Sequence, residues 1–323
     1  MSKRIAIEIG GTKLQAALGD ASGAIETVRR TPAEPEKGHG SILENIRKLV
    51  EPLLSPAVDR IGVGFGGPVD ASAGRTVKSH QVPGWDNFPL ADWATQRFGR
   101  PCALENDTNC GGLAEALAGA GRGGRCVFYS NIGSGIGGAI VIDGKLHNGR
   151  YGAGEVGHAY VWDPHAQQYD IVEHLCSGWA LGRRAKQLAR AGELPRLLEL
   201  AGGNPENLNA YIVGAALAME CGQAGMDEPS IQQAGMDEAA LDEAGRLMDE
   251  LTATYAVALA NVIALINPDR IVIGGGVSLI GRPLFGRLER ELRRICFAPY
   301  RDNWQLLPAA LGENVVLAGA LML

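Results

Sequence analysis

Hydrophobic and polar residues alternate along the chain in short runs that end in glycine. Residues 4–9 alternate as a strand does, and a second such run follows at LQAALGD, so the intervening GGT predicts a β-hairpin. The segment CVFYSNIGSGIGGAIVIDGKL repeats the pattern, and RIGVGFGG and RIVIGGG also end in glycine. Glycine lets the backbone adopt unusual angles or approach a ligand closely. Four such places indicate a ligand that is held largely by backbone groups.

Apolar positions at helical spacing predict the helices of the chain, and Asn267-Pro268 ends the longest one. Ser41 and Glu44 fit a capping box at the first of them. The alternation of strands and helices, with glycine hairpins near residues 10 and 134, predicts an α/β protein of two related halves with a cleft between them. The predicted helices cover residues 41–54, 173–191, 207–221, about 236–266 and 284–296.

Composition and charge narrow the possible classes of protein. The 323 residues suffice for two domains, and 46% hydrophobic with 20% charged residues is ordinary for a soluble protein. The net charge of −6 disfavours nucleic acid and anionic membranes as partners. No apolar run reaches the roughly 18 residues of a membrane helix, and the N-terminus lacks a signal-peptide pattern, so we expect a cytoplasmic protein. The six cysteines contain no CxxC pair, which favours free thiols.

Two glycine patterns resemble a dinucleotide-binding motif and fail its requirement. Residues 133–138 and 62–67 both match GxGxxG. That motif needs a helix to open at its last glycine, whereas a strand follows the first match and Pro-Val-Asp follows the second. The chain also lacks a P-loop.

Paired hairpins offer another way to hold phosphates, because backbone N–H groups of tight turns form anion sites. Thr12 and Ser134 add hydroxyl donors, and Glu8 beside the first turn is suited to hold Mg²⁺ through water. Ordinary glycine-rich turns are the alternative for either hairpin alone. The two hairpins together with GGG at 274–276 favour phosphate binding.

The sequence resembles the ROK-family sugar kinases of the actin/hexokinase-like superfamily over nearly its whole length. The motifs that carry the resemblance occur in family order: EIGGTK, GFGGPVD, VPGW, ENDTN, NIGSGIGGAIVIDG, GAGEVGH and NPDRIVIGGGVS. The resemblance implies two ribonuclease-H-like domains, 1–118 plus about 300–323 and 119–299. The family also contains repressors with an N-terminal helix-turn-helix. Because the first strand begins at about residue 4, we expect the kinase branch.

The resemblance assigns Asp107 as the general base. A carboxylate is ionised at neutral pH and can accept the proton of an attacking hydroxyl, although an Asp at a helix start is also a common N-cap. The implied sugar-binding residues are Gly66, Gly67, Asn106, Asp107, Glu155, His158 and Glu173. The implied nucleotide-binding residues are Gly10, Gly11, Thr12, Lys13, Gly133, Ser134, Gly135, Gly275 and Gly276.

The family's zinc motif is not kept. Its cysteine positions hold Pro164, Ala166 and Ile171, so we expect no structural zinc. The spacing of His158, His165, His174 and Cys176 fits no metal pattern. We expect apolar contacts from Trp162, Tyr169, Ile171 and Val172 to support the loop instead.

The resemblance therefore implies an ATP- and Mg²⁺-dependent homodimeric kinase that phosphorylates a hexose, glucose first, at its 6-hydroxyl. Two departures leave the sugar open: Glu8 replaces the more usual Asp, and Gln81 replaces an Asn found in many members. The alternatives are kinases of N-acetylglucosamine, N-acetylmannosamine or fructose, and a sugar-responsive regulator without turnover. ATP and polyphosphate are both open as phosphate donors.

Overall fold

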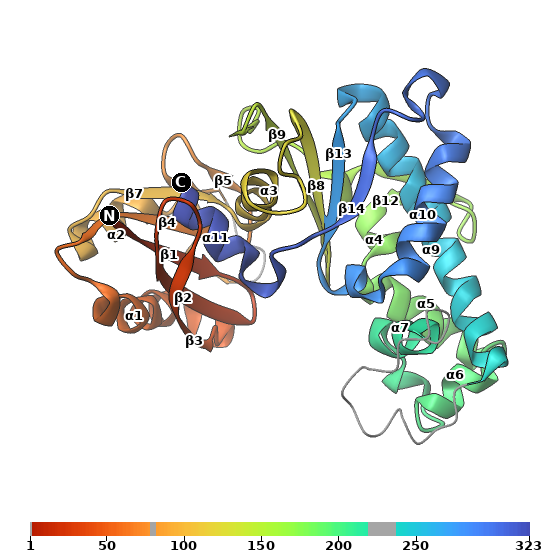
Figure 1. The fold of residues 1–323 in the computed structure, drawn as a ribbon. Helices are drawn as coiled ribbons and strands as arrows, with labels where there is room; N and C mark the ends of the chain where they lie inside the picture. The colour runs from red at the N-terminus through yellow and green to blue at the C-terminus, as the bar shows by residue number, and fades with distance from the viewer. Residues whose placement is uncertain (1, 78–81, 219–236) are drawn as a thin grey trace. The chain divides into compact units, whose positions relative to one another are not determined.

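The protein forms two compact units. The computed structural model describes residues 2–77, 82–218 and 237–323 (Figure 1). Unit 1 comprises Met1–Tyr129, Gly138–Gly154 and Ala309–Leu323, and unit 2 comprises Ser130–Gly137 and Glu155–Pro308. The α/β class predicted from the alternating pattern is confirmed. The domain boundaries expected near residues 118 and 300 stay a prediction.

Unit 1 is built on a five-stranded sheet of order β3-β2-β1-β4-β7. The first three strands form antiparallel hairpins, while β1, β4 and β7 run parallel. The predicted hairpin at residues 4–19 is therefore confirmed as β1 and β2. The strands are β1 Lys3–Ile9, β2 Lys13–Gly19, β3 Ile25–Pro32, β4 Val58–Phe65 and β7 Cys102–Asn106. A small ribbon pairs β5 Val69–Asp70 with β6 Arg75–Thr76.

The two faces of this sheet differ in the size of their side chains. One face carries Ile5, Ile7 and Ile9 and packs with α1 Gly38–Val50 and α2 Leu90–Phe98 in a large apolar core. The opposite face carries Ala6 and Ala17 and packs with α3 Asp107–Leu117 and α11 Val315–Met322. Small side chains let these two helices approach the strands closely.

Glycines bring the backbones of unit 1 into direct contact. A Cβ on Gly62 would lie 1.8 Å from the carbonyl oxygen of Ala320, and one on Gly319 would lie 1.8 Å from that of Cys110. Strand β4 thus touches α11, and α11 touches α3, with no side chain between them. The position of α3 is consequently fixed by backbone shape.

A second five-stranded sheet has the order β10-β9-β8-β13-β14. Strands β13 and β14 pair in parallel, whereas β9 and β10 pair as a hairpin. Its strands are β8 Cys126–Ile132, β9 Ile136–Ile142, β10 Lys145–Leu146, β13 Arg270–Gly274 and β14 Gln305–Pro308. A separate hairpin pairs β11 Tyr160–Asp163 with β12 Gln168–Ile171. The α-helices among the described residues of unit 2 are α4 Val172–Cys176, α5 Gly178–Arg190, α6 Pro195–Leu200, α7 Ala210–Ala218, α9 Glu238–Ile266 and α10 Arg282–Ile295.

Two helix predictions need correction. The capping box is wrong, because α1 begins at Gly38 and places Ser41 inside the helix. The single helix expected over 173–191 is divided at Ser177, whose extended backbone (ψ 165°) ends α4 and whose hydroxyl caps α5. Gly138 lies within strand β9, which confirms that the GxGxxG match there belongs to a hairpin. The structure describes only residues up to 218 of the helix expected to end at 221.

Helix α9 bears on the expectation that the chain contains no apolar segment long enough to cross a membrane. Although it contains no unbroken apolar run, it has an 18-residue window of mean hydropathy 1.4, which by length and composition suffices to cross a membrane. A buried core helix passes the same test. Leu247, Leu251, Tyr255, Leu259 and Ile263 are buried at helical spacing, and α9 packs against α4, α7 and α10.

The close contact between α11 and α3 predicts that Gly319→Ala destabilises the protein. The added Cβ overlaps the backbone of Cys110. Backbone atoms cannot move aside as the end of a flexible side chain can. We expect the free energy of unfolding, measured by urea denaturation, to fall by about 1–3 kcal/mol. Gly40→Ala in α1 is the matched control, because no atom lies within 4 Å of its added Cβ; a loss of similar size there would refute the packing argument.

Candidate functional site

The first glycine turn connects β1 and β2 in unit 1. Gly10 N–H donates to the carbonyl of Lys13 at 3.1 Å and closes the turn, which leaves Gly11 and Thr12 exposed. Gly66 lies beside this turn, since its N–H donates to the carbonyl of Ile9 at 2.8 Å. Gly66, which is expected to bind sugar, therefore lies next to the turn that is expected to bind phosphates.

Glu8 is a buried carboxylate at the base of this turn. Its Oε2 accepts a hydrogen bond from Gln15 Nε2 at 2.8 Å, and its Oε1 lies 3.8 Å from Lys13 Nζ. Burial raises the pKa of Glu8, and Lys13 and Gln15 partly offset that effect. A carboxylate beside a phosphate-type turn suits a hydrated Mg²⁺, which usually keeps several waters and binds one or two carboxylates.

Asp107 lies where β7 ends and α3 begins. Asn106, not Asp107, is the N-cap: its Oδ1 accepts the N–H groups of Thr108 and Asn109. Asp107 is the first helical residue, and its Oδ1 accepts the N–H of Thr108 at 2.7 Å. Its Oδ2 lies beside Gly66, where an added Cβ would be 3.3 Å away. The N-cap interpretation of Asp107 is therefore wrong, and the helix start still orients its carboxylate.

The ENDTN motif contains a supporting residue, Glu105, that the resemblance did not assign to the site. Glu105 is buried, and its Oε1 accepts hydrogen bonds from Asn106 N–H at 2.8 Å and from Asn109 Nδ2 at 3.0 Å. Its Oε2 accepts from Asn148 Nδ2. The motif itself pointed to Glu105, whereas nothing in the sequence connects Asn148 with a residue 43 positions earlier.

The second glycine turn connects β8 and β9, and its residues Gly133–Gly135 belong to unit 2. Gly133 N–H donates to the carbonyl of Gly135 at 2.9 Å. Gly275, in the left-handed region at φ 85°, packs against strand β8, which precedes the turn: a Cβ added to Gly275 would lie 2.4 Å from Asn131 Oδ1. The structure thus brings this turn together with Gly275, while Gly276 borders open space.

The three acidic and basic residues expected to bind sugar in unit 2 share one neighbourhood. Glu155 precedes the short 3₁₀ helix η3 Val156–His158, and His158 N–H donates to its carbonyl at 3.0 Å. Glu155 is exposed to solvent on one side. The protein atoms around its carboxyl desolvate the group and raise its pKa. His158 lowers this pKa and Glu173 raises it further, so Glu155 interacts electrostatically with both residues.

Glu173 also contacts the glycine turn. Its Oε2 accepts the N–H of Ile136 at 2.8 Å, at the exit of the turn. A Cβ on Gly157 would lie 2.0 Å from the carbonyl oxygen of Ile136, so η3 packs against the other side of the same residue. Both expected sugar-binding segments of unit 2 therefore meet the backbone of Ile136.

The hairpin β11–β12 occupies the segment in which the family's zinc motif is not kept. Asp163 Oδ1 accepts the N–H groups of His165 and Ala166 and closes its tip. Val161 and Val172 are buried. Trp162 and Tyr169 are exposed and contact each other edge to face at 5.3 Å, so the expectation that they pack the loop onto the protein is wrong. These two aromatic rings lie on the outer face of the ribbon.

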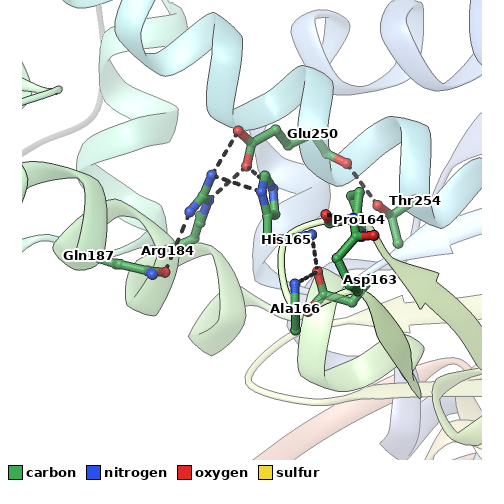
Figure 2. A network of polar contacts seen from close by, with 9 residues as sticks. Asp163, Pro164, His165, Ala166, Arg184, Gln187, Glu250 and Thr254 are labelled. Carbon is green, nitrogen blue, oxygen red and sulfur yellow. Dashed lines mark hydrogen bonds and ion pairs between the residues drawn. The ribbon is translucent and has the colours of Figure 1, made fainter.

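A polar cluster attaches the tip of this hairpin to two helices (Figure 2). His165 Nε2 lies 3.2 Å from Glu250 Oε2 on α9. Arg184 on α5 donates to both carboxylate oxygens of Glu250, at 2.9 and 3.2 Å. The hydrogen bond to Glu250 raises the pKa of Arg184. The pKa of Glu250 is lowered, because Arg184 outweighs its partial burial.

Residues 2–77, 82–218 and 237–323 contain no group of three or more His, Cys, Asp or Glu side chains placed to hold a metal ion. Among the described candidates, His174 pairs with Asp170 at 2.9 Å and Cys176 is buried. Gln81 lies outside the described residues.

These features define a class: an α/β protein with glycine turns suited to phosphates and carboxylates suited to sugar hydroxyls. The ROK family model matches residues 4–323, and the chain therefore belongs to the ROK family. The prediction of a ROK-family sugar kinase is confirmed.

Similar proteins support this assignment. A glucokinase of Thermotoga maritima is 29% identical over 98% of this chain and 96% of its own length. An N-acetylgalactosamine kinase of Shewanella is 29% identical over 84% of this chain and 81% of its own length. The structure of a ROK family glucokinase from Streptomyces griseus in complex with glucose and AMPPNP is 29% identical, with a TM-score of 0.77 over 99% of this chain and 98% of that one.

The hairpin geometry predicts activity without zinc. Asp163 closes the hairpin tip through hydrogen bonds, and His165 on that tip contacts Glu250 of α9, so the position of the hairpin does not require a metal. Purified protein should contain well under one zinc per chain by elemental analysis, and a zinc-selective chelator in excess Mg²⁺ should leave turnover unchanged. Loss of turnover that only added zinc restores would contradict this prediction.

Proposed function

We propose that this chain is an ATP-dependent hexose kinase that transfers a phosphoryl group to the 6-hydroxyl of glucose. The carrying observation is the carboxylate of Asp107, which the first turn of α3 orients beside the backbone of Gly66. A hydroxyl that attacks phosphorus must lose its proton, and an oriented carboxylate accepts it. Asp107 is the general base in this proposal.

Hydrogen-bonding groups are the proposed sugar contacts of each unit. In unit 1 the proposed contacts are Gly66, Gly67 and Asn106, whose Nδ2 donates to the carbonyl of Gly67 at 3.1 Å. In unit 2 they are Glu155, His158 and Glu173. Carboxylate and imidazole groups suit hydroxyls, because they accept and donate hydrogen bonds in defined directions.

The phosphates of ATP are held mainly by backbone. Gly10, Gly11, Thr12 and Lys13 supply the first turn, and Gly133, Ser134 and Gly135 supply the second. Gly275 and Gly276 are proposed to lie near the adenosine. Glu8 would hold Mg²⁺ through water, and this ion neutralises charge on the phosphates when bound. Positioning and electrostatic stabilisation account for most of the catalysis of phosphoryl transfer.

The related structure that contains glucose and AMPPNP supports glucose and ATP as substrates. The Shewanella relative, an N-acetylgalactosamine kinase by name, favours an amino sugar as the second candidate substrate. A homodimer in the cytoplasm is part of the proposal and rests on the family resemblance.

Coupled ADP release over a panel of hexoses and N-acetylhexosamines tests the proposal. Glucose should give the highest kcat/KM, and polyphosphate in place of ATP, scored by sugar phosphate formed, identifies the donor. Hexose binding without ADP release or sugar phosphate would indicate a regulator instead of an enzyme.

Asp107→Asn should abolish most turnover. Asparagine keeps the shape and still accepts the N–H of Thr108, but it is a poor base. We expect kcat to fall at least about 100-fold, with sugar Kd largely unchanged. Asp92→Asn, at an exposed first-turn position of α2, is the matched control and should keep full kcat. Near-normal turnover of Asp107→Asn would remove Asp107 from the base role.

The raised pKa of Glu155 predicts an acid-sensitive KM for the sugar. A raised pKa means that Glu155 takes up a proton at a higher pH than an ordinary glutamate, and the protonated form is a weaker acceptor. Sugar KM should therefore rise as pH falls, before the acid limb expected of an unperturbed carboxyl. Glu155→Gln should raise KM at neutral pH and remove this limb; an identical pH profile in that variant would assign the limb elsewhere.

A further inference from the structure

The phosphate-type turn of unit 2 is held from outside by the segment that carries Glu173. Glu173 Oε2 accepts the N–H of Ile136 at 2.8 Å, and Gly178 N–H donates to the carbonyl of Gly133 at 2.8 Å. One segment, 173–178, thus bonds both ends of the turn. Between these contacts Ser177 is buried and its N–H donates to the carbonyl of Glu173 at 3.2 Å, which links the two anchor points.

The two oxygens of Glu173 have different surroundings. A Cβ added to Gly135 would lie 2.5 Å from Oε2 and 3.8 Å from Oε1. Oε2 is therefore pressed against the turn, and Oε1 is directed away from it. The carboxylate that is proposed to bind the sugar is therefore also the hydrogen-bond acceptor of the turn.

We propose that Glu173 is a positioning residue that couples hexose binding to the order of the phosphate turn. This inference rests on the proposed function, because it takes Glu173 as a sugar-binding residue. A sugar hydroxyl that donates to the carboxylate fixes its orientation. The bond from Ile136 then holds the N–H groups of Gly133–Gly135 in place for phosphates. Each ligand orders a group that the other needs, so each should tighten the binding of the other by the same factor.

Typical coupling between two sites changes affinity about 5- to 150-fold. We expect saturating glucose to lower the Kd of the non-hydrolysable analogue AMPPNP with Mg²⁺ at least about 5-fold. The reciprocal experiment should lower the Kd of glucose by the same factor. Isothermal titration calorimetry measures both.

A pair of variants on the turn separates this local coupling from any other cause of cooperativity. Gly135→Ala places a methyl group on Glu173 Oε2 and must displace the carboxylate. We expect it to weaken glucose binding about 10-fold with no nucleotide present. Gly133→Ala is the matched control, because its Cβ meets only Asn131 Oδ1 at 3.4 Å and Gly135 O at 4.0 Å; it should weaken AMPPNP binding and leave glucose Kd within about two-fold.

Variants of Glu173 supply the converse test. Glu173→Ala removes the acceptor of Ile136 N–H and should weaken AMPPNP binding without any sugar. Glu173→Gln keeps a carbonyl oxygen at that place, so AMPPNP Kd without sugar should return to within about two-fold of wild type, while glucose binding stays weak. Thermal melts of both variants establish that they are folded.

Three outcomes overturn the inference: unchanged glucose Kd in Gly135→Ala, unchanged AMPPNP Kd in Glu173→Ala, or independent binding of the two ligands to the wild type. Wild-type protein that binds no hexose of the panel would instead overturn the proposed function, and the coupling with it. Failure of the coupling alone is thus distinguishable, because glucose and AMPPNP then still bind and turnover still occurs.

Discussion

Direct backbone contact between α3, α11 and β4 is the constraint on which unit 1 depends. Gly62 and Gly319 leave no room for even a methyl group, and Gly64 lies against the side chain of Val316. Asp107 begins α3, so any displacement of this helix moves the carboxylate relative to Gly66. Close packing of this kind transmits small changes in volume, because protein interiors have little free space. The position of α3, and with it that of the Asp107 carboxylate, is thus set by glycine and alanine, and not by large core side chains.

In unit 2, hydrogen bonds hold the second glycine turn in position. Two of the three residues in the turn at Gly133–Gly135 are glycines, which offer no side chain for packing, and neighbouring polar groups hold the turn instead. Ser130 and Tyr255 add a second anchor, since the Tyr255 hydroxyl donates to Ser130 Oγ at 2.6 Å and Ser130 Oγ donates to the carbonyl of Gly137 at 2.8 Å. Helix α9 thereby supports the same hairpin that Glu173 contacts.

Two carboxylates of the candidate site, Glu8 and Glu155, lie where desolvation makes their ionised forms less favourable. Burial raises the pKa values of Glu8 and Glu155, which means that their ionised forms are disfavoured where they lie. Perturbed groups of this kind cluster at functional sites. The cluster of His165, Arg184 and Glu250 is different, because Arg184 and Glu250 form an ion pair and His165 contacts Glu250, which connects the hairpin to α9.

The sequence by itself determined the α/β class, the two glycine hairpins, the end of α9 at Asn267 and the family, because strand alternation, helical spacing and glycine turns are local signals. It also placed Asp107 at a helix start. Only the tertiary structure decided that Asn106 is the cap, that Asn148 bonds Glu105, and that Trp162 and Tyr169 face outward. It also decided that Glu173 reaches Ile136, 37 residues earlier in the chain. These contacts join residues from separate elements, and their geometry follows from how the elements pack, which no local pattern in the sequence records.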